Sequence, residues 1–188
     1  MEIKNPLYIS DRNEWRDWLR ENFETENEAW LFYSKKSSGK QRILYNDAVE
    51  EALCFGWIDS TLKGIDNQYY AQRFTPRRKK SEYSQANKER LRWLAERNLL
   101  HPSVYIKVKH ILDEKFNFPE DIIEAIRSNE ITWKNYCKFS ESYKRLRISY
   151  IETARTRPEE FKKRLENFIN KTSDNKLVPG FGGIEKYY

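Results

Sequence analysis

Two strand-like segments joined by a short turn, residues 56–65 and 68–75, constrain the fold more than any other feature of this sequence. Both segments alternate apolar and polar side chains, as half-buried strands do, and the GIDNQ turn between them suits a hairpin. Pro76 follows and ends the second strand. The alternation places two sets of side chains on opposite faces of the first strand: Trp57, Asp59, Thr61 and Lys63 on one, and Ile58, Leu62 and Ile65 largely on the other.

Helical patterns and one further strand surround this hairpin. Residues 28–35 form a continuous apolar run, typical of a strand buried on both faces. Helical spacing appears at 10–22, at 46–55 with Gly56 as its stop, and at 83–98. Beyond residue 98 all segments are helical: 104–116, 119–128, 131–139, 140–155 and the segment that Pro158 opens. The sequence therefore predicts an α+β fold, a small antiparallel sheet packed with helices and followed by a C-terminal helical bundle.

The change of pattern along the chain suggests its organisation. We expect an α+β domain at 1–116, a helical module at 117–175 and a tail at 176–188. The tail, KLVPGFGGIEKYY, is rich in glycine and aromatic residues. It either docks through its aromatic rings or is mobile, and the sequence leaves both alternatives open.

Positive charge is concentrated in one part of the chain. The whole chain has 35 Lys and Arg against 29 Asp and Glu, a net charge of +6. Nine basic and three acidic residues lie between Arg73 and Arg97, so this stretch alone carries an excess equal to that of the chain. One basic face would attract an anionic partner.

The expected compartment of the protein and the expected state of its cysteines both rest on features that the sequence lacks. MEIKNPLYISDRNEW has no apolar region typical of a signal peptide, and no run approaches the roughly 18 apolar residues of a membrane span. We therefore expect a cytoplasmic protein. Cys54 and Cys137, the only cysteines, lie in apolar contexts without a CxxC spacing, which favours two buried thiols.

Several segments resemble a known family. ALCFGWIDS (52–60), RFTPRRKKSEYS (73–84) and the Asn-Lys-Glu-Arg residues at 87–90 are similar to the signature of the YdeI/OmpD-associated, or bacteriocin-protection, family. Three helical segments resemble its C-terminal module: PEDIIEAIRSN (119–129), SYKRLRISYIETA (142–154) and KKRLENFI (162–169). Tyr83 departs from the usual Trp, and Pro158, Glu159 and Phe161 interrupt a basic cluster near the C-terminal end.

The resemblance carries expectations about fold and role. It implies a relationship to the YjbR/CyaY-like superfamily, with an antiparallel sheet packed against helices. It also implies an association with stress or bacteriocin resistance. It brings no established reaction.

The sequence lacks the motifs of several chemistries. His101 and His110 show no metal-ligand spacing, and no phosphate-binding glycine loop is present. Asp47, Glu50, Glu51 and Asp59 could bind a hard cation, and the CyaY-like fold that the resemblance implies makes iron a candidate, but acids on the outer face of a helix are usually solvated. Cys54 and the serines have no triad context. We expect no metal and no cofactor, and the catalytic residues remain unassigned.

Asp59 is the polar residue of the GWIDS segment that most needs a partner, because an unpaired inward carboxylate is costly. Arg73 on the next strand is the obvious candidate for a cross-strand pair. The pair is either purely structural or part of a site in which Asp59, Arg73 and Arg77 orient a polar ligand.

The basic stretch after the hairpin has two interpretations. It is a solvated face, or it is an anion site built from arginines, serine hydroxyls and the N-terminus of a helix, beside aromatics that could stack on bases. The candidate ligand-binding residues are Trp57, Asp59, Arg73, Thr75, Arg77, Arg78, Lys79, Ser81, Ser84 and Asn87.

Three hypotheses of function follow. The preferred one is a non-enzymatic module that binds an anionic partner, with DNA or RNA as a candidate, through the basic hairpin–helix surface. The second is an enzyme acting on a small anionic or phosphorylated ligand in a cleft lined by Asp59 and Arg73. The third is a regulatory adaptor that docks through the helical bundle. The ligand and the oligomeric state are not encoded in any recognisable motif.

Overall fold

The computed structural model describes residues 3, 6–34, 41–78, 81–180 and 185–188. The chain divides into two compact units. The first contains Met1–Glu82 and Leu91–Lys109, and the second contains Tyr83–Arg90 and His110–Tyr188. Helices α3 (Gln85–Glu96) and α4 (Pro102–Leu112) each contribute residues to both units.

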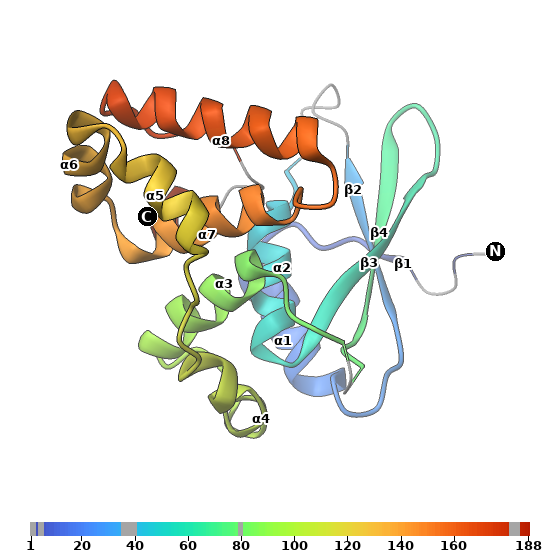
Figure 1. Cartoon of the computed structure of the whole chain (residues 1–188). Coiled ribbons are helices and arrows are strands. Elements are labelled where there is room, and N and C mark those ends of the chain that lie inside the picture. Colours follow the sequence, from blue (N-terminus) through green and yellow to red (C-terminus); the bar gives the residue numbers. More distant parts are fainter. Residues whose placement is uncertain (1–2, 4–5, 35–40, 79–80, 181–184) are drawn as a thin grey trace. The chain divides into compact units, whose positions relative to one another are not determined.

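The described residues of the first unit form a four-stranded sheet in the order β1-β2-β4-β3 (Figure 1). Its strands are β1 (Pro6–Leu7), β2 (Ala29–Ser34), β3 (Trp57–Gly64) and β4 (Tyr69–Pro76). β4 pairs antiparallel with both β2 and β3, which confirms the predicted hairpin and the predicted buried strand. β1 runs parallel to β2, so the sheet is mixed rather than purely antiparallel.

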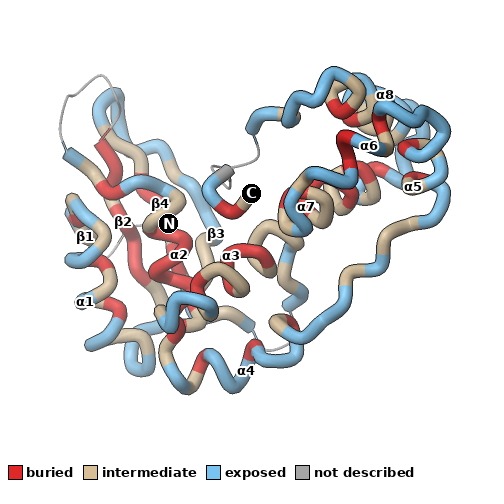
Figure 2. Tube along the Cα trace, turned by 90° about the vertical axis from the view of Figure 1, so that its left-hand side faces the viewer, coloured by how far each residue is buried: buried red, intermediate tan, exposed pale blue. Residues whose placement is uncertain are grey.

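Helices α1 (Arg12–Asn22) and α2 (Tyr45–Cys54) lie on one side of this sheet (Figure 1). Trp15 of α1 contacts Phe74 of β4, with ring centroids 5.4 Å apart. Buried residues run along β2 and α2 (Figure 2), as expected for the inner layer of an α+β unit. The predicted stop at Gly56 is confirmed, because this residue has φ +73°, a conformation that glycine adopts without strain.

A register shift interrupts β3 and corrects the predicted alternation of its side chains. Asp59 pairs with Phe74, whereas Leu62 pairs with Gln72. The two paired positions are thus three residues apart along β3 but only two residues apart along β4. One extra residue is therefore inserted, as in a β-bulge. Leu62 lies on the same face as Asp59 and not on the opposite one, because Gln72 and Phe74 share a face.

The second unit contains the predicted helical bundle. Its helices are α5 (Glu120–Arg127), α6 (Glu130–Lys138), α7 (Glu141–Glu152) and α8 (Pro158–Ser173). Asn135 of α6 donates to the backbone carbonyl of Thr172 in α8 at 3.1 Å, which ties these two helices together. Within the part of the chain that is described, no helix has both the length and the apolar character needed to cross a bilayer. The core of the bundle consists of Ile122, Ile126, Tyr136, Tyr143, Ile148, Ile151 and Phe168.

The described residues of the tail dock on this core through their aromatic rings and backbone. A short 3-10 helix, Glu185–Tyr187, buries Tyr187, and the ring of Tyr188 meets that of Tyr143 edge-on at 4.8 Å. The hydroxyl of Tyr143 also accepts the backbone N–H of Val178 at 2.8 Å. Of the two alternatives for the tail, docking is the one the structure shows.

The first half of α3 is held within the second unit by ion pairs. Arg145 donates to both carboxylate oxygens of Glu89, from Nε and Nη2, at 2.7 Å each. Glu89 is only 2% exposed, so this two-point pair is shielded from water. Lys88 pairs with Glu114 at 2.5 Å in the same unit.

Candidate functional site

The strand register places the predicted residues of the hairpin on two faces of the sheet. Asp59 pairs directly with Phe74, and directly paired residues point to the same side. Arg73 precedes Phe74 on β4 and therefore points to the opposite side. A cleft lined jointly by Asp59 and Arg73 does not exist in this geometry.

The predicted ion pair between Asp59 and Arg73 is accordingly wrong. Asp59 accepts a hydrogen bond from the hydroxyl of Tyr45, the first residue of α2, at 2.6 Å. Arg73 pairs with Glu28, just before β2, with 2.5 Å between Nη2 and the carboxylate. Each charged group has its own partner on its own side of the sheet.

Trp57 and Thr75 follow the same division. Trp57 is 1% exposed and donates its indole N–H to the carbonyl of Phe23 at 3.1 Å. It is a core residue and offers no face for stacking on a ligand. Thr75 pairs with Ile58 on the side that carries Arg73, and is partly exposed.

The described residues of the loop after β4 form hydrogen bonds to backbone carbonyls of the loop and of Gly56. The N–H of Arg77 donates to the carbonyl of Gly56, and the Arg77 guanidinium donates to the carbonyls of Ser81 and Glu82. Ser81 donates its hydroxyl to the carbonyl of Arg78 at 3.0 Å. The side chain of Arg78 is exposed. Lys79 lies outside the described residues.

Ser84 and Asn87 stand at the start of α3, within the second unit. The hydroxyl of Ser84 accepts the N–H of Asn87 at 3.4 Å, and Asn87 accepts from Arg90 at 3.0 Å. Of the predicted site residues that the structure describes, Arg77, Arg78 and Ser81 lie together in one loop of the first unit, whereas Ser84 and Asn87 belong to the second unit.

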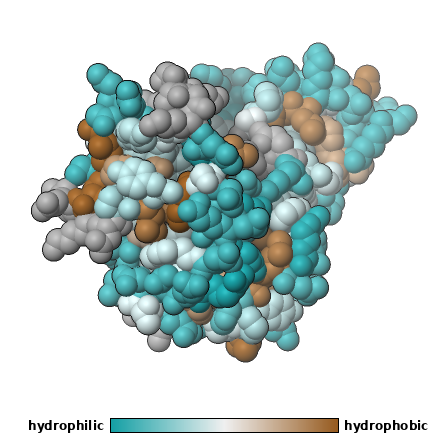
Figure 3. Space-filling view, turned by 180° about the vertical axis from the view of Figure 1, so that it is seen from behind, coloured by the Kyte–Doolittle hydropathy of each residue, from teal (hydrophilic) through white to brown (hydrophobic). Residues whose placement is uncertain are grey.

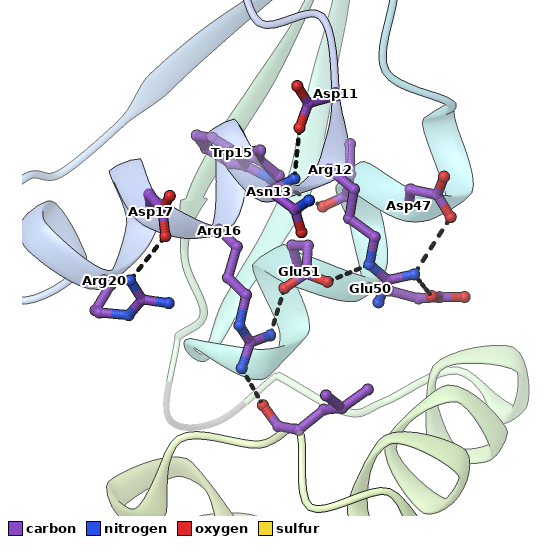
Figure 4. Close-up of polar contacts among 12 residues, drawn as sticks. Asp11, Arg12, Asn13, Trp15, Arg16, Asp17, Arg20, Asp47, Glu50 and Glu51 are labelled. Atoms are coloured by element: carbon purple, nitrogen blue, oxygen red, sulfur yellow. Dashed lines mark hydrogen bonds and ion pairs between the residues drawn. The ribbon is translucent and has the colours of Figure 1, made fainter.

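A cluster of buried charges between α1 and α2 was not predicted (Figure 4). Arg12 pairs with Glu51 and with Glu50, the latter at 2.8 Å, and reaches Asp47 at 3.4 Å. Arg16 donates to the second oxygen of Glu51 at 2.6 Å and to the carbonyl of Leu99 at 2.8 Å. Two arginines of one helix thus bind the acids of the next.

Burial distinguishes this cluster from a solvated helix face. Glu50 is 0% and Glu51 1% exposed, so the expectation of solvated acids on α2 is wrong for these two residues. Burial lowers the pKa of Arg12, but attraction to Glu51 and Glu50 outweighs it and leaves that pKa above its ordinary value. The carboxylates are bound by guanidinium groups, so the cluster fastens α1 to α2 rather than presenting an acid or base.

Two features of the sequence could have indicated this cluster. Glu50 and Glu51 interrupt an otherwise apolar run, AVEEALC, in a helix too apolar to have a solvated side. Arg12 and Arg16 are four residues apart and so share one side of their helix. A buried acid pair in an apolar helix requires cationic partners, and α1 supplies them in the partly exposed Arg12 and Arg16.

The two cysteines differ in their surroundings. Cys54 is buried, as expected, and burial together with the charge of Glu51 raises the pKa of its thiol to about 12. The expectation of a second buried thiol is wrong, because Cys137 on α6 is exposed. Among the residues with described positions, no three His, Cys, Asp or Glu side chains gather as metal ligands would.

Comparisons with known proteins match two successive segments of the chain to two different families. Residues 7–107, more than half of the chain, match the model of a domain family of unknown function (DUF8412). The chain belongs to this family. Residues 115–175 match the family described as Bacteriocin-protection, YdeI or OmpD-Associated. Neither the curated proteins nor the solved structures contain a match.

The two family matches cover different parts of the resemblance seen in the sequence. It is confirmed for the helical segment, which the YdeI/OmpD-associated model covers. ALCFGWIDS and RFTPRRKKSEYS lie instead within the residues matched by the family of unknown function. Neither match supports the relationship to the YjbR/CyaY-like superfamily.

Proposed function

We propose that this chain is a non-enzymatic, cytoplasmic binding module whose first unit takes an anionic polymer, DNA or RNA, on the loop that follows β4. The observation that carries the proposal is the exposed side chain of Arg78, which makes no ion pair with any residue in the described part of the chain. It stands in the stretch that holds a positive excess equal to that of the whole chain.

The loop is shaped to present this charge. The Arg77 guanidinium binds the carbonyls of Ser81 and Glu82, and the Ser81 hydroxyl binds the carbonyl of Arg78, so the backbone of Arg78 itself is held by a hydrogen bond. A guanidinium on a fixed backbone loses less entropy when it contacts a phosphate. Phosphate contacts of this kind give affinity without sequence preference.

The alternative of an enzyme loses its support from geometry. Asp59 and Arg73 lie on opposite faces of the sheet and bind different partners. The adaptor hypothesis would need an exposed apolar face, and on the face drawn in Figure 3 the hydrophobic residues lie in small groups among hydrophilic ones. Scattered apolar residues are normal for a surface.

The test is a titration of the full chain against labelled single- and double-stranded DNA and RNA at two salt concentrations. Arg78→Ala is the variant, since Arg77→Ala would also release the loop. Arg157→Ala, which removes an exposed arginine of the second unit, is the matched control. We expect wild-type dissociation constants of about 10⁻⁴–10⁻⁶ M at physiological salt.

The salt dependence distinguishes a phosphate contact from a general charge effect. Arg78→Ala should weaken binding to every sequence alike and reduce the salt slope by about one, whereas Arg157→Ala should leave both unchanged. Absence of binding at low salt, or equal losses in the two variants, would reject the proposal.

A further inference from the structure

The second unit contains a cavity of about 250 Å³ between α7 and α8 that the proposed function does not use. All of its lining belongs to this unit, and all but one residue lies on those two helices. The lining residues are Arg147, Tyr150, Ile151, Glu160, Lys163, Arg164, Asn167, Phe168 and Val178.

Arg147 is the unusual member of this lining. It is only 4% exposed, yet no carboxylate pairs with it among the side chains that the structure describes, a set that does not include Glu185. Its Nη2 donates to the carbonyls of Val178 and Gly180 and to the hydroxyl of Tyr188, while its Nε has no hydrogen-bond partner among those residues. A buried guanidinium normally has an anionic partner, because burial of an uncompensated charge is costly.

The other charges of the cavity do not supply that partner. Glu160, its only carboxylate in the described lining, pairs with Arg164 at 2.8 Å, and this hydrogen bond holds the pKa of Glu160 below its usual range. Arg164 also donates to the carbonyl of Tyr150 at 2.7 Å. Lys163 is exposed at the rim. The described lining therefore carries three cations and one anion that is already paired.

Beside these charges and the polar groups of Tyr150 and Asn167, the cavity has an apolar wall. Ile151 and Phe168 are 1% and 2% exposed and form part of the bundle core, and Val178 of the tail lies beside them. A site with positive charge next to an apolar wall favours a ligand that has both characters. The volume restricts that ligand to a small molecule.

We propose that the α7–α8 cavity binds a small organic oxyanion, a carboxylate or phosphomonoester with a short apolar group, whose oxygens face Arg147 and Lys163 and whose apolar group contacts Ile151 and Phe168. This site is separate from the Arg78 loop. It lies in the segment that matches the YdeI/OmpD-associated family.

The experiment is calorimetric titration of the full chain at low salt with three probes: benzoate, phenyl phosphate and inorganic phosphate. Lys163→Gln removes a rim charge without touching the core. Lys162→Gln is its matched control, because it removes the neighbouring exposed lysine of α8, which does not line the cavity. Arg147→Gln is the stronger variant, although it also removes the hydrogen bonds that hold the tail.

We expect one of the two aromatic probes to bind at one site per chain, and their relative affinity identifies carboxylate or phosphomonoester. Lys163→Gln should weaken binding about threefold or more, as loss of a partly solvated charge contact does, and Lys162→Gln should leave it unchanged. Arg147→Gln should weaken it by about tenfold or more, if the variant folds.

Three results would overturn the proposal. One is a lack of heat from every probe up to about 10 mM, a concentration that detects even very weak sites. The second is equal weakening by Lys162→Gln and Lys163→Gln, which would mean that only the general charge of α8 matters. The third is equal affinity for inorganic phosphate and phenyl phosphate, because the apolar wall would then contribute nothing.

Discussion

Asp59 and Arg73 occupy neighbouring antiparallel strands but project from opposite faces of the sheet, and each binds a different partner. Their charges are therefore separated by the sheet itself. Energetic coupling between two side chains requires contact or a shared partner, and these two have neither.

The first prediction is that a double-mutant cycle on Asp59→Asn and Arg73→Gln gives a coupling energy below about 0.5 kcal/mol. The same cycle on Glu28→Gln and Arg73→Gln should give a measurable coupling of up to about 1 kcal/mol, since this pair is partly exposed. Urea unfolding of the single and double variants measures both. Strong coupling between Asp59 and Arg73 would contradict the register.

The second prediction concerns the buried charges of α1 and α2. Glu51→Gln removes the carboxylate that Arg12 and Arg16 share, and should lower the free energy of unfolding by about 1.5–3 kcal/mol, because both arginines remain partly solvated and Arg12 keeps its pair with Glu50. Asp17→Asn is the control on α1, because its pair with Arg20 is 59% exposed on both sides and should contribute at most about 1 kcal/mol. Similar losses in both variants would show that burial does not matter there.

The third prediction concerns thiol reactivity. Cys137 is exposed and Cys54 is buried, so a thiol reagent should label one cysteine rapidly in the folded protein. The second should react only after addition of denaturant. Cys137→Ser should abolish the rapid phase and Cys54→Ser should leave it intact, and the opposite assignment would contradict the structure.

The fourth prediction is a loss of stability at alkaline pH. Burial raises the pKa of Cys54 from 9.0 to about 12, and burial also raises the pKa values of Tyr33, Tyr136 and Tyr143. Between pH 9.0 and about pH 12, the Cys54 thiol has lost its proton in the unfolded state but keeps it in the folded state. The unfolded state then binds fewer protons, so stability falls as pH rises.

Urea unfolding at a series of pH values measures this effect. The contribution of the Cys54 thiol to stability is fully present below pH 9.0. Between pH 9.0 and about pH 12, this thiol alone lowers the free energy of unfolding by up to about 1.4 kcal/mol for each pH unit. Cys54→Ala should give a shallower decline than the wild type, with the tyrosines responsible for the rest. An identical decline in both proteins would mean that the thiol ionises normally.

The elements of the fold follow from periodicity, but several of their details do not. Helix and strand patterns locate α1, α2 and the hairpin because their apolar spacing is regular. β1 is only two residues long and has no pattern to recognise. The register shift after Asp59 depends on pairing with β4, so spacing along β3 alone placed Leu62 on the wrong face.

The candidate sites depend even more on contacts between distant residues. Glu50 lies in an apolar helix, but its partner Arg12 lies 38 residues earlier in the chain, so the pair cannot be read from either helix alone. Arg147 belongs to a basic segment that resembles a solvated face, whereas its partners are backbone groups and a phenol of the tail. Local sequence identifies charge but does not show which charges the fold will enclose.

The pair of Glu89 and Arg145 also bears on how such chains evolve. Glu89 lies within the segment matched by one family and Arg145 within the segment matched by the other. A recombination event that joined either segment to an unrelated neighbour would leave one of these charges without its partner. Selection should therefore preserve the two residues together, so that they change as a pair or not at all when lineages diverge.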